Sequence, residues 1–198
     1  MPSGFDDDPH SQDGQACPRN FFGITSYEEL KAKEAVYVPK RALELRVNGM
    51  RDAFDTGHLR KIHWYLFRDV FPWAGELRMV GLSKVGGAPF ANPMYIGSVL
   101  TSLFEELKSE NYLRGTDAAS FVKRAAYYLG EINATHPFRE GNGRSQREFL
   151  RQLAVQAGYR LAWADLDEQT NKVASILSHT RRDNSGLERI LERALRGD

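Results

Sequence analysis

The sequence has only one cysteine and no long apolar run. Cys17 cannot form an internal disulfide, so the fold does not depend on an oxidising compartment. No segment reaches the roughly 18 consecutive apolar residues that a membrane-spanning helix needs, and we expect no membrane association. The N-terminus also lacks the basic start and apolar core of a secretory signal. These absences favour a cytoplasmic protein of bacterial type.

An excess of one charge is missing as well. The chain carries 27 lysines and arginines against 26 aspartates and glutamates. Binding to the phosphate backbone of nucleic acid needs a concentrated basic face, so no direct nucleic-acid binding is expected. The 198 residues are enough for one domain that buries a single core without disulfides or metal.

The polar N-terminus is expected to differ from the rest of the chain. Residues 1–18 are rich in Asp, Ser, Gly and Gln, which predicts a flexible tail followed by one domain over residues 19–198. In that domain the apolar residues recur at helical spacing. The stripes cover residues 59–70, 96–107, 121–132 and 149–154, with weaker ones at 168–178 and 186–196.

One segment breaks the helical pattern. Residues 77–93 contain glycines, prolines and short apolar runs, and Val85–Ala88 is typical of a turn between two extended arms. The predicted fold class is therefore all-α with one β-hairpin.

The loop at residues 136–147 carries the candidate chemistry, with the sequence HPFREGNGRSQR. Pro137 disfavours helical geometry at His136, so a helix should end there. A new helix should begin at about Asn142 to Arg144, and its free N–H groups would form an anion site. Arg144 and Arg147 lie three residues apart on its first turn, where two guanidinium groups suit a polyphosphate.

Two further side chains would flank this anion. Glu140 offers hard oxygen ligands, which suit a magnesium ion shared with phosphate oxygens. His136 can act as a general base near neutral pH. A base, a metal ligand, a backbone cradle and a charge clamp are the parts needed for phosphoryl or nucleotidyl transfer.

The twelve residues resemble the Fic signature H-x-F-x-(D/E)-G-N-G-R-x-x-R at every fixed position. The upstream stretch from Ile62 to Arg78 is similar to the segment that precedes the hairpin in that family. The resemblance covers about residues 20–195 and is to bacterial Fic toxins and to the Fic domains of Bartonella-type effectors. It implies a Fic-type helical domain with a hairpin flap.

The resemblance also implies roles for the loop residues. His136 would deprotonate a hydroxyl on a target protein, which then attacks the α-phosphorus of ATP. Glu140 would hold Mg²⁺ against the phosphates, Arg144 would steady the leaving group and Arg147 would bind the γ-phosphate. The phosphates would be cradled by Gly141, Asn142 and Gly143, through backbone amides and the Asn side chain.

Phe138 is expected to point into the core and anchor the loop. The hairpin would be the flap that pairs with the target backbone as an added strand. Its candidate target-positioning residues are Lys84, Val85, Gly86 and Phe90. The intact Gly-Asn-Gly-Arg form favours AMP transfer over the kinase reaction of relatives that have replaced it.

Many Fic enzymes carry an inhibitory helix with the pattern (S/T)-x-x-x-E-(G/N). Thr25 and Glu29 have the spacing, but Leu30 follows, and Ser102 and Glu106 are followed by Leu107. The resemblance therefore implies a separate small antitoxin that supplies this helix.

Alternatives to AMP transfer stay open from the sequence. One is transfer of another phosphate-linked group, such as UMP or phosphocholine, and another is a nucleotide-binding adaptor without turnover. The target could be bacterial, as for free-standing toxins, or a host protein if the chain is secreted as part of an effector.

Overall fold

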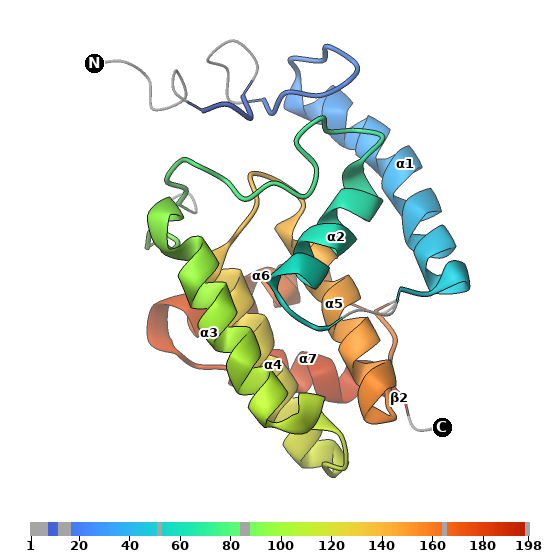
Figure 1. Ribbon diagram of the computed structural model, residues 1–198, viewed down its shortest axis with the longest axis vertical. Helices are drawn as coiled ribbons and strands as arrows, with labels where there is room; N and C mark the ends of the chain where they lie inside the picture. The colour runs from blue at the N-terminus through green and yellow to red at the C-terminus, as the bar shows by residue number, and fades with distance from the viewer. Residues whose placement is uncertain (1–7, 12–16, 51–52, 84–87, 164–165, 197–198) are drawn as a thin grey trace.

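The computed structural model describes residues 8–11, 17–50, 53–83, 88–163 and 166–196. Within these ranges the chain is almost wholly helical, which confirms the all-α prediction (Figure 1). The α-helices are α1 (Tyr27–Asn48), α2 (Thr56–Phe67), α3 (Ile96–Ser109), α4 (Ala118–Thr135), α5 (Asn142–Ala157), α6 (Glu168–Arg181) and α7 (Ser185–Ala194). Two 3₁₀ turns, η1 (Pro93–Tyr95) and η2 (Asn111–Leu113), flank α3, and two short strands are β1 (Arg160–Leu161) and β2 (Leu195–Arg196).

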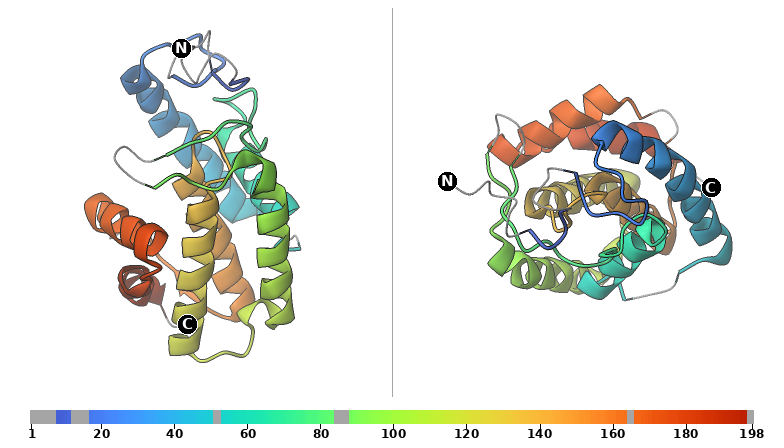
Figure 2. Two further views of the ribbon diagram at one scale, coloured as in Figure 1. Left: turned by 90° about the vertical axis from the view of Figure 1, so that its left-hand side faces the viewer. Right: turned by 90° about the horizontal axis from the view of Figure 1, so that it is seen from above.

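Helices α4 and α5 lie side by side at the centre of the molecule (Figure 1). Helix α3 packs on α4, α2 packs on α5, and α1 covers α2 from outside, while α6 and α7 contact α4. Seen from above, the other helices surround α4 (Figure 2). This packing places the loop between α4 and α5 at one end of the bundle, beneath the segment that joins α2 to α3.

Capping residues set the boundaries of the two central helices. Asp117 is the N-cap of α4, and its carboxylate accepts the Ser120 N–H at 3.0 Å. Helix α5 ends at Gly158, whose φ of 89° is a left-handed conformation that glycine adopts without strain. Most side chains of the predicted apolar stripes are buried, with Phe121 and Phe149 fully enclosed, whereas Val99, Val173 and Ile176 are exposed.

Helix α1 is an element that the periodicity did not single out. It carries Pro39 in its interior, and its apolar side chains Val36, Leu43 and Val47 are exposed. A helix without a clear amphipathic stripe gives no strong periodic signal. Its position matters because it borders the loop between α4 and α5.

The structure describes the two arms of the predicted hairpin, and they pair with each other. Ser83 and Pro89 form an antiparallel bridge, and the Phe90 N–H donates to the Leu82 carbonyl at 3.0 Å. Lys84, Val85 and Gly86, the predicted target-positioning residues of the turn, lie outside the described residues. The pairing of β1 with β2 was not expected, because each strand has only two residues.

The N-terminal residues that the structure describes, 8–11 and 17–18, include side chains that pack against the helical domain. Asp8 pairs with Arg139 at 2.7 Å, and both side chains are buried. The His10 ring stacks on Trp73 with centroids 5.0 Å apart, and Cys17 is buried too. Among these residues it is Asp8 that satisfies a buried arginine of the loop rather than facing water.

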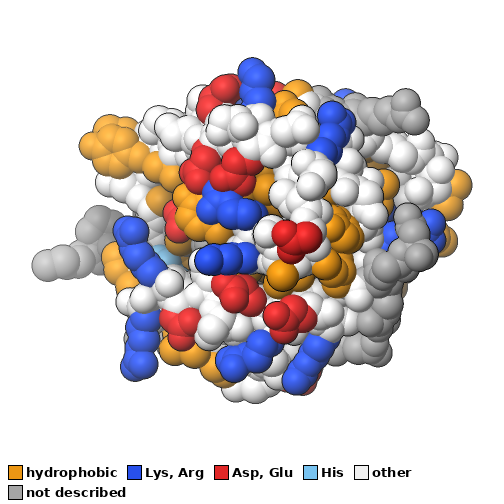
Figure 3. Space-filling model, turned by 90° about the horizontal axis from the view of Figure 1, so that it is seen from below, with side chains coloured by type: hydrophobic (Ala, Val, Ile, Leu, Met, Phe, Trp, Pro, Cys, Tyr) orange, Lys and Arg blue, Asp and Glu red, His pale blue; other side chains and the backbone are white. Residues whose placement is uncertain are grey.

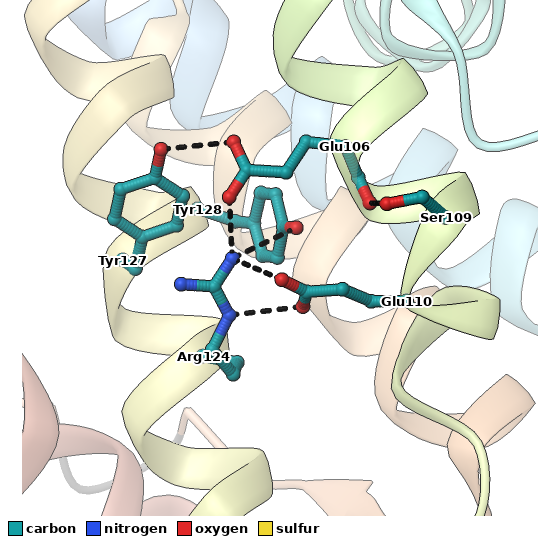
Figure 4. A network of polar contacts seen from close by, with 6 residues as sticks. All are labelled: Glu106, Ser109, Glu110, Arg124, Tyr127 and Tyr128. Carbon is teal, nitrogen blue, oxygen red and sulfur yellow. Dashed lines mark hydrogen bonds and ion pairs between the residues drawn. The ribbon is translucent and has the colours of Figure 1, made fainter.

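One arginine fixes α3 against α4 (Figure 4). The Arg124 guanidinium pairs with Glu110 and with Glu106, the latter at 2.7 Å, and donates to the Tyr128 hydroxyl at 3.2 Å. The Tyr127 hydroxyl donates to Glu106 at 3.0 Å. These contacts hold the C-terminal half of α3 on the outer face of α4.

Charges of both signs are mixed on the surface seen from below (Figure 3). Blue and red side chains alternate there, with small apolar areas between them, so this face offers no concentrated basic patch. Among the residues that the structure describes, no helix is both long and apolar enough to span a bilayer.

Candidate active site

His136 ends α4 in a left-handed conformation, with φ 47° and ψ 62°. Its N–H still donates to the Ile132 carbonyl at 2.9 Å, and Pro137 then turns the chain away. A left-handed residue other than glycine costs about 1–2 kcal/mol and is uncommon outside turns and functional sites. The predicted end of the helix at His136 is confirmed.

The His136 imidazole lies flat against the Phe90 ring. The ring centroids are 3.9 Å apart and the planes differ by 9°. Phe90 is nearly buried and belongs to the second arm of the hairpin. The flap and the candidate base are therefore in direct contact, although the two residues lie far apart in the sequence.

The loop between the two helices is held by one asparagine. The Asn142 side chain donates to the Phe138 carbonyl at 2.7 Å and accepts the Phe138 N–H at 2.9 Å. Asn142 is buried, so its side chain holds the loop and leaves the backbone N–H as its contribution to an anion site. The role predicted for the Asn142 side chain in the phosphate cradle stays a prediction.

Gly141 must be glycine for two reasons. Its φ of 79° is left-handed, and a Cβ at this position would lie 2.4 Å from the Phe67 ring. The next helix begins at Asn142, as predicted, and its first N–H groups have no partner within the helix. Gly143 is exposed at the positive end of α5, whereas Gly141 and Asn142 are buried.

The Arg147 guanidinium is a candidate anion-binding group. No carboxylate oxygen of the described chain lies within 4.0 Å of its guanidinium, which sits beside Gly143. Burial, followed by the nearby charge of Arg144, lowers the pKa of Arg147. A partly desolvated cation at a helix N-terminus gains most from a bound anion.

Arg144 is engaged with acidic side chains. It pairs with Glu34 of α1, and its guanidinium lies 3.7 Å from a carboxylate oxygen of Glu140. It also lies over the Phe67 ring at 4.6 Å. Burial raises the pKa of the Glu34 carboxyl, and the Arg144 charge opposes this shift.

The Glu140 carboxylate sits at the entrance to the anion site. One oxygen accepts the Gly141 N–H at 2.9 Å, and the other accepts the Tyr27 hydroxyl. Burial, then the Glu140 charge, raises the pKa of Tyr27, so its hydroxyl stays protonated and donates. Mg²⁺ in nucleotide sites often takes only one or two carboxylates and fills its shell with phosphate oxygens and water, so a lone Glu140 fits such an ion.

His63 supports the loop from below. Its Nδ1 accepts the Gly75 N–H at 2.8 Å, so the proton is on Nε2, which donates to the Glu140 carbonyl at 3.0 Å. The ring stacks on Phe138 with centroids 3.9 Å apart. Complete burial lowers the pKa of His63 to about 3, which keeps the imidazole neutral.

The structure thus brings the predicted loop residues together and adds others that sequence reasoning missed. Phe138 is fully buried, as predicted for an anchor. No sequence motif predicted the roles of Tyr27 and Glu34, or the hydrogen bond of His63 to the loop. The only available signal for His63 was its place in an apolar helical stripe, which indicated packing.

The matches to known proteins agree with this geometry. The Fic/DOC family model matches residues 53–154, which includes the loop, His63 and the hairpin. A protein named probable protein adenylyltransferase Fic, from Escherichia coli K12, is 37% identical over 162 residues, which cover 82% of this chain and 80% of that protein. The chain belongs to the Fic/DOC family.

Other relatives are similar over most of this chain. Protein adenylyltransferase VbhT of Bartonella schoenbuchensis is 41% identical over 87% of this chain, which spans only 36% of VbhT. The crystal structure of the Bartonella tribocorum effector BepC with bound AMPPNP has a TM-score of 0.87 and 26% identity, covering 96% of this chain and 97% of that one. The N-terminal Fic domain of a Bartonella quintana effector with bound ADP has a TM-score of 0.84 and 28% identity, covering 93% and 92%.

Proposed function

We propose that this Fic-family chain is a protein adenylyltransferase that moves AMP from ATP onto a Tyr, Thr or Ser hydroxyl of a target protein. The observation that carries the proposal is the loop from His136 to Arg147: His136 ends α4, the first N–H groups of α5 have no partner within the helix, and no carboxylate oxygen of the described residues lies within 4.0 Å of the Arg147 guanidinium. Relatives named protein adenylyltransferases and relatives with bound nucleotide support it.

His136 acts as the general base in this mechanism. Its imidazole accepts the proton of the target hydroxyl, and the oxygen forms a bond to the α-phosphorus of ATP. The bond between the α-phosphorus and the bridging oxygen breaks, and pyrophosphate leaves with the electron pair. The target then carries AMP as a phosphodiester, and His136 carries the proton.

The N-terminus of α5 binds the phosphates. The N–H groups of Asn142 and Gly143 donate to phosphate oxygens, joined by the Gly141 N–H once it releases the Glu140 carboxylate, and Arg147 binds the γ-phosphate. Arg144 stabilises the charge on the leaving pyrophosphate, either while it still pairs with Glu34 or after that ion pair has broken. Glu140 would hold Mg²⁺, which when bound neutralises phosphate charge.

The hairpin positions the target. Its arms meet at Ser83 and Pro89, and Phe90 brings the second arm against His136. A target segment added as a strand to an arm would place its hydroxyl near the imidazole. Lys84, Val85 and Gly86 are proposed to contribute to this docking.

A small antitoxin is proposed as a second partner. A groove of about 290 Å³ between α1 and α5 is lined by apolar side chains, including Val38, Leu66 and Trp163, and reaches Arg144 and Arg147. A helix in this groove could bring an acidic side chain to Arg147. We propose that the protein acts in the bacterial cytoplasm, or in a host cell if it is secreted as an effector.

Labelled ATP tests the reaction. The chain is incubated with bacterial or host-cell lysate and ATP labelled at the α- or the γ-phosphate. Label from the α position alone, on a protein band, supports AMP transfer. Label from the γ position would mean a kinase. Nucleotide binding without any label would favour an adaptor or another donor, such as one carrying UMP or phosphocholine.

A further inference from the structure

Arg78 is a buried cation that pairs with main-chain carbonyls instead of a carboxylate. It is 2% exposed, and no carboxylate oxygen of the described residues lies within 4.0 Å of its guanidinium. Burial lowers the pKa of Arg78 to about 10, and the side chain remains charged at neutral pH. An isolated buried charge is costly, so its acceptors must compensate.

These acceptors come from two separate parts of the site. In the hairpin arms, the guanidinium donates to the carbonyls of Val80 at 2.7 Å and Ala91 at 2.5 Å. At the end of α4 it donates to the carbonyls of His136 at 2.7 Å and Thr135 at 3.1 Å. One planar group therefore joins both arms of the flap to the residue that carries the base.

The α4 end is a favourable place for this cation. The last carbonyls of a helix have no partner within the helix and carry the negative end of its dipole. Arg78 satisfies two of them where His136 takes its left-handed conformation. The Arg78 N–H adds a hydrogen bond to the Pro137 carbonyl at 2.9 Å, and the Ala91 N–H donates to the Ala134 carbonyl at 3.2 Å.

We propose that Arg78 is a positioning residue that couples the target-binding flap to His136. It acts through the backbone at both ends and touches neither the nucleotide nor the target. The inference rests on the proposed function and deepens it. It assigns to Arg78 the alignment of a docked hydroxyl with the base, while nucleotide binding depends on the separate α5 terminus.

A guanidinium is required because of its geometry. Its N–H donors lie in one plane and point in fixed directions, which lets it reach carbonyls on opposite sides. A lysine at this position keeps the charge but offers a single nitrogen, which cannot bind four carbonyls on two segments in this arrangement. Arg78→Lys thus tests the geometry of the guanidinium while it leaves the positive charge in place.

The test compares Arg78→Lys and the neutral Arg78→Gln with wild type and with a control, Arg60→Lys. Arg60 also donates to a carbonyl, that of Gly75 at 2.8 Å, but does not bond the flap arms or the α4 end. Affinity for AMPPNP is measured by calorimetry. The rate of α-label incorporation is measured over a range of lysate concentrations, which gives an apparent KM and a maximal rate for the acceptor.

We expect the Arg78 variants to lose acceptor efficiency while they keep their affinity for AMPPNP. Both Arg78 variants keep AMPPNP affinity within about twofold of wild type, while the acceptor efficiency falls about 100-fold, as for a misplacement of about 1 Å. Arg60→Lys keeps both. Wild-type acceptor efficiency in Arg78→Lys would overturn the proposal, as would a parallel loss of AMPPNP affinity and activity, which would indicate a general structural role.

If the variants do not fold, amide hydrogen exchange on the wild-type enzyme tests whether the flap and the end of α4 are coupled. The Arg78 and Ala91 amides, which bond the loop and α4, are expected to exchange together at one slow rate, as parts of one cooperative unit. Independent exchange of the two amides would refute the coupling. This readout needs no AMP transfer, so it stays valid if the proposed function itself fails.

Discussion

The imidazole of His136 and the ring of Phe90 are stacked almost in parallel, 3.9 Å between centroids. Through this contact the second arm of the hairpin lies against the residue that ends α4. The flap and the candidate base, which are far apart in the sequence, therefore meet in the fold.

The first prediction concerns His136→Ala. The variant should fold and bind AMPPNP as wild type does, because the phosphate contacts come from α5. Transfer of the α-label should fall by about 10²- to 10⁴-fold, the usual contribution of a general base. Thermal unfolding, calorimetry and label transfer check the three parts. Near-normal transfer by a folded variant would remove His136 from the role of base.

The second prediction concerns Glu34→Gln. The Glu34 carboxylate is buried and competes with phosphate for the Arg144 guanidinium. Removing its charge should tighten AMPPNP binding by about fivefold, which corresponds to about 1 kcal/mol. Glu44→Gln on the same helix, whose partner is Arg41, serves as the control and should bind like wild type.

Calorimetric titration distinguishes the two possible roles of Glu34. Weaker binding in Glu34→Gln than in Glu44→Gln would show that the carboxylate orients Arg144 for phosphate rather than competing for it.

The third prediction is a pH dependence of stability that His63 causes. Its pKa is about 3 in the folded protein against an ordinary 6.5, so between these values the unfolded chain binds more protons. Stability from neutral His63 is complete above pH 6.5 and is lost as the pH falls toward 3, by at most about 1.4 kcal/mol per pH unit. In His63→Gln, which cannot titrate, this part of the slope should vanish.

Chemical denaturation from pH 7 to pH 4 measures how the free energy of unfolding changes with pH. Carboxylates titrate alike in both proteins, so the difference between wild type and His63→Gln isolates the histidine. Equal slopes in wild type and His63→Gln would mean that His63 is not held neutral by the fold.

The fourth prediction concerns the contacts in Figure 4. Arg124→Ala removes the group that joins Glu106 of α3 and Glu110, the residue that caps α3, to α4 and should lower the free energy of unfolding by about 1–2 kcal/mol. Lys123→Ala, at the exposed neighbouring position, should change it by less than about 0.5 kcal/mol. A loss no larger in Arg124→Ala than in Lys123→Ala would show that these contacts are not stabilising.

Much of the fold and the loop could be predicted because their signals are local. Pro137 after His136, Gly141 before Asn142 and Asp117 before α4 each set a boundary through backbone geometry or a cap. The amphipathic stripes marked the helices that bury one face. Each of these signals depends on residues a few positions apart in the chain.

The rest depends on contacts between distant segments. Glu34 and Tyr27 reach the site only because α1, which has Pro39 and no apolar stripe, packs beside it. Asp8 looked like part of a flexible tail because composition cannot reveal a buried partner such as Arg139. Arg78 has no carboxylate partner among the residues that the structure describes, and its acceptors are main-chain carbonyls, which every residue type has.

The most direct test of the central claim is a structure of this chain with AMPPNP and Mg²⁺. The account predicts the phosphates within hydrogen-bond distance of the Gly141–Gly143 amides and of the Arg147 guanidinium, with the His136 imidazole facing the α-phosphorus. A nucleotide bound elsewhere, or one whose α-phosphorus lies beyond the reach of a hydroxyl held by His136, would contradict it.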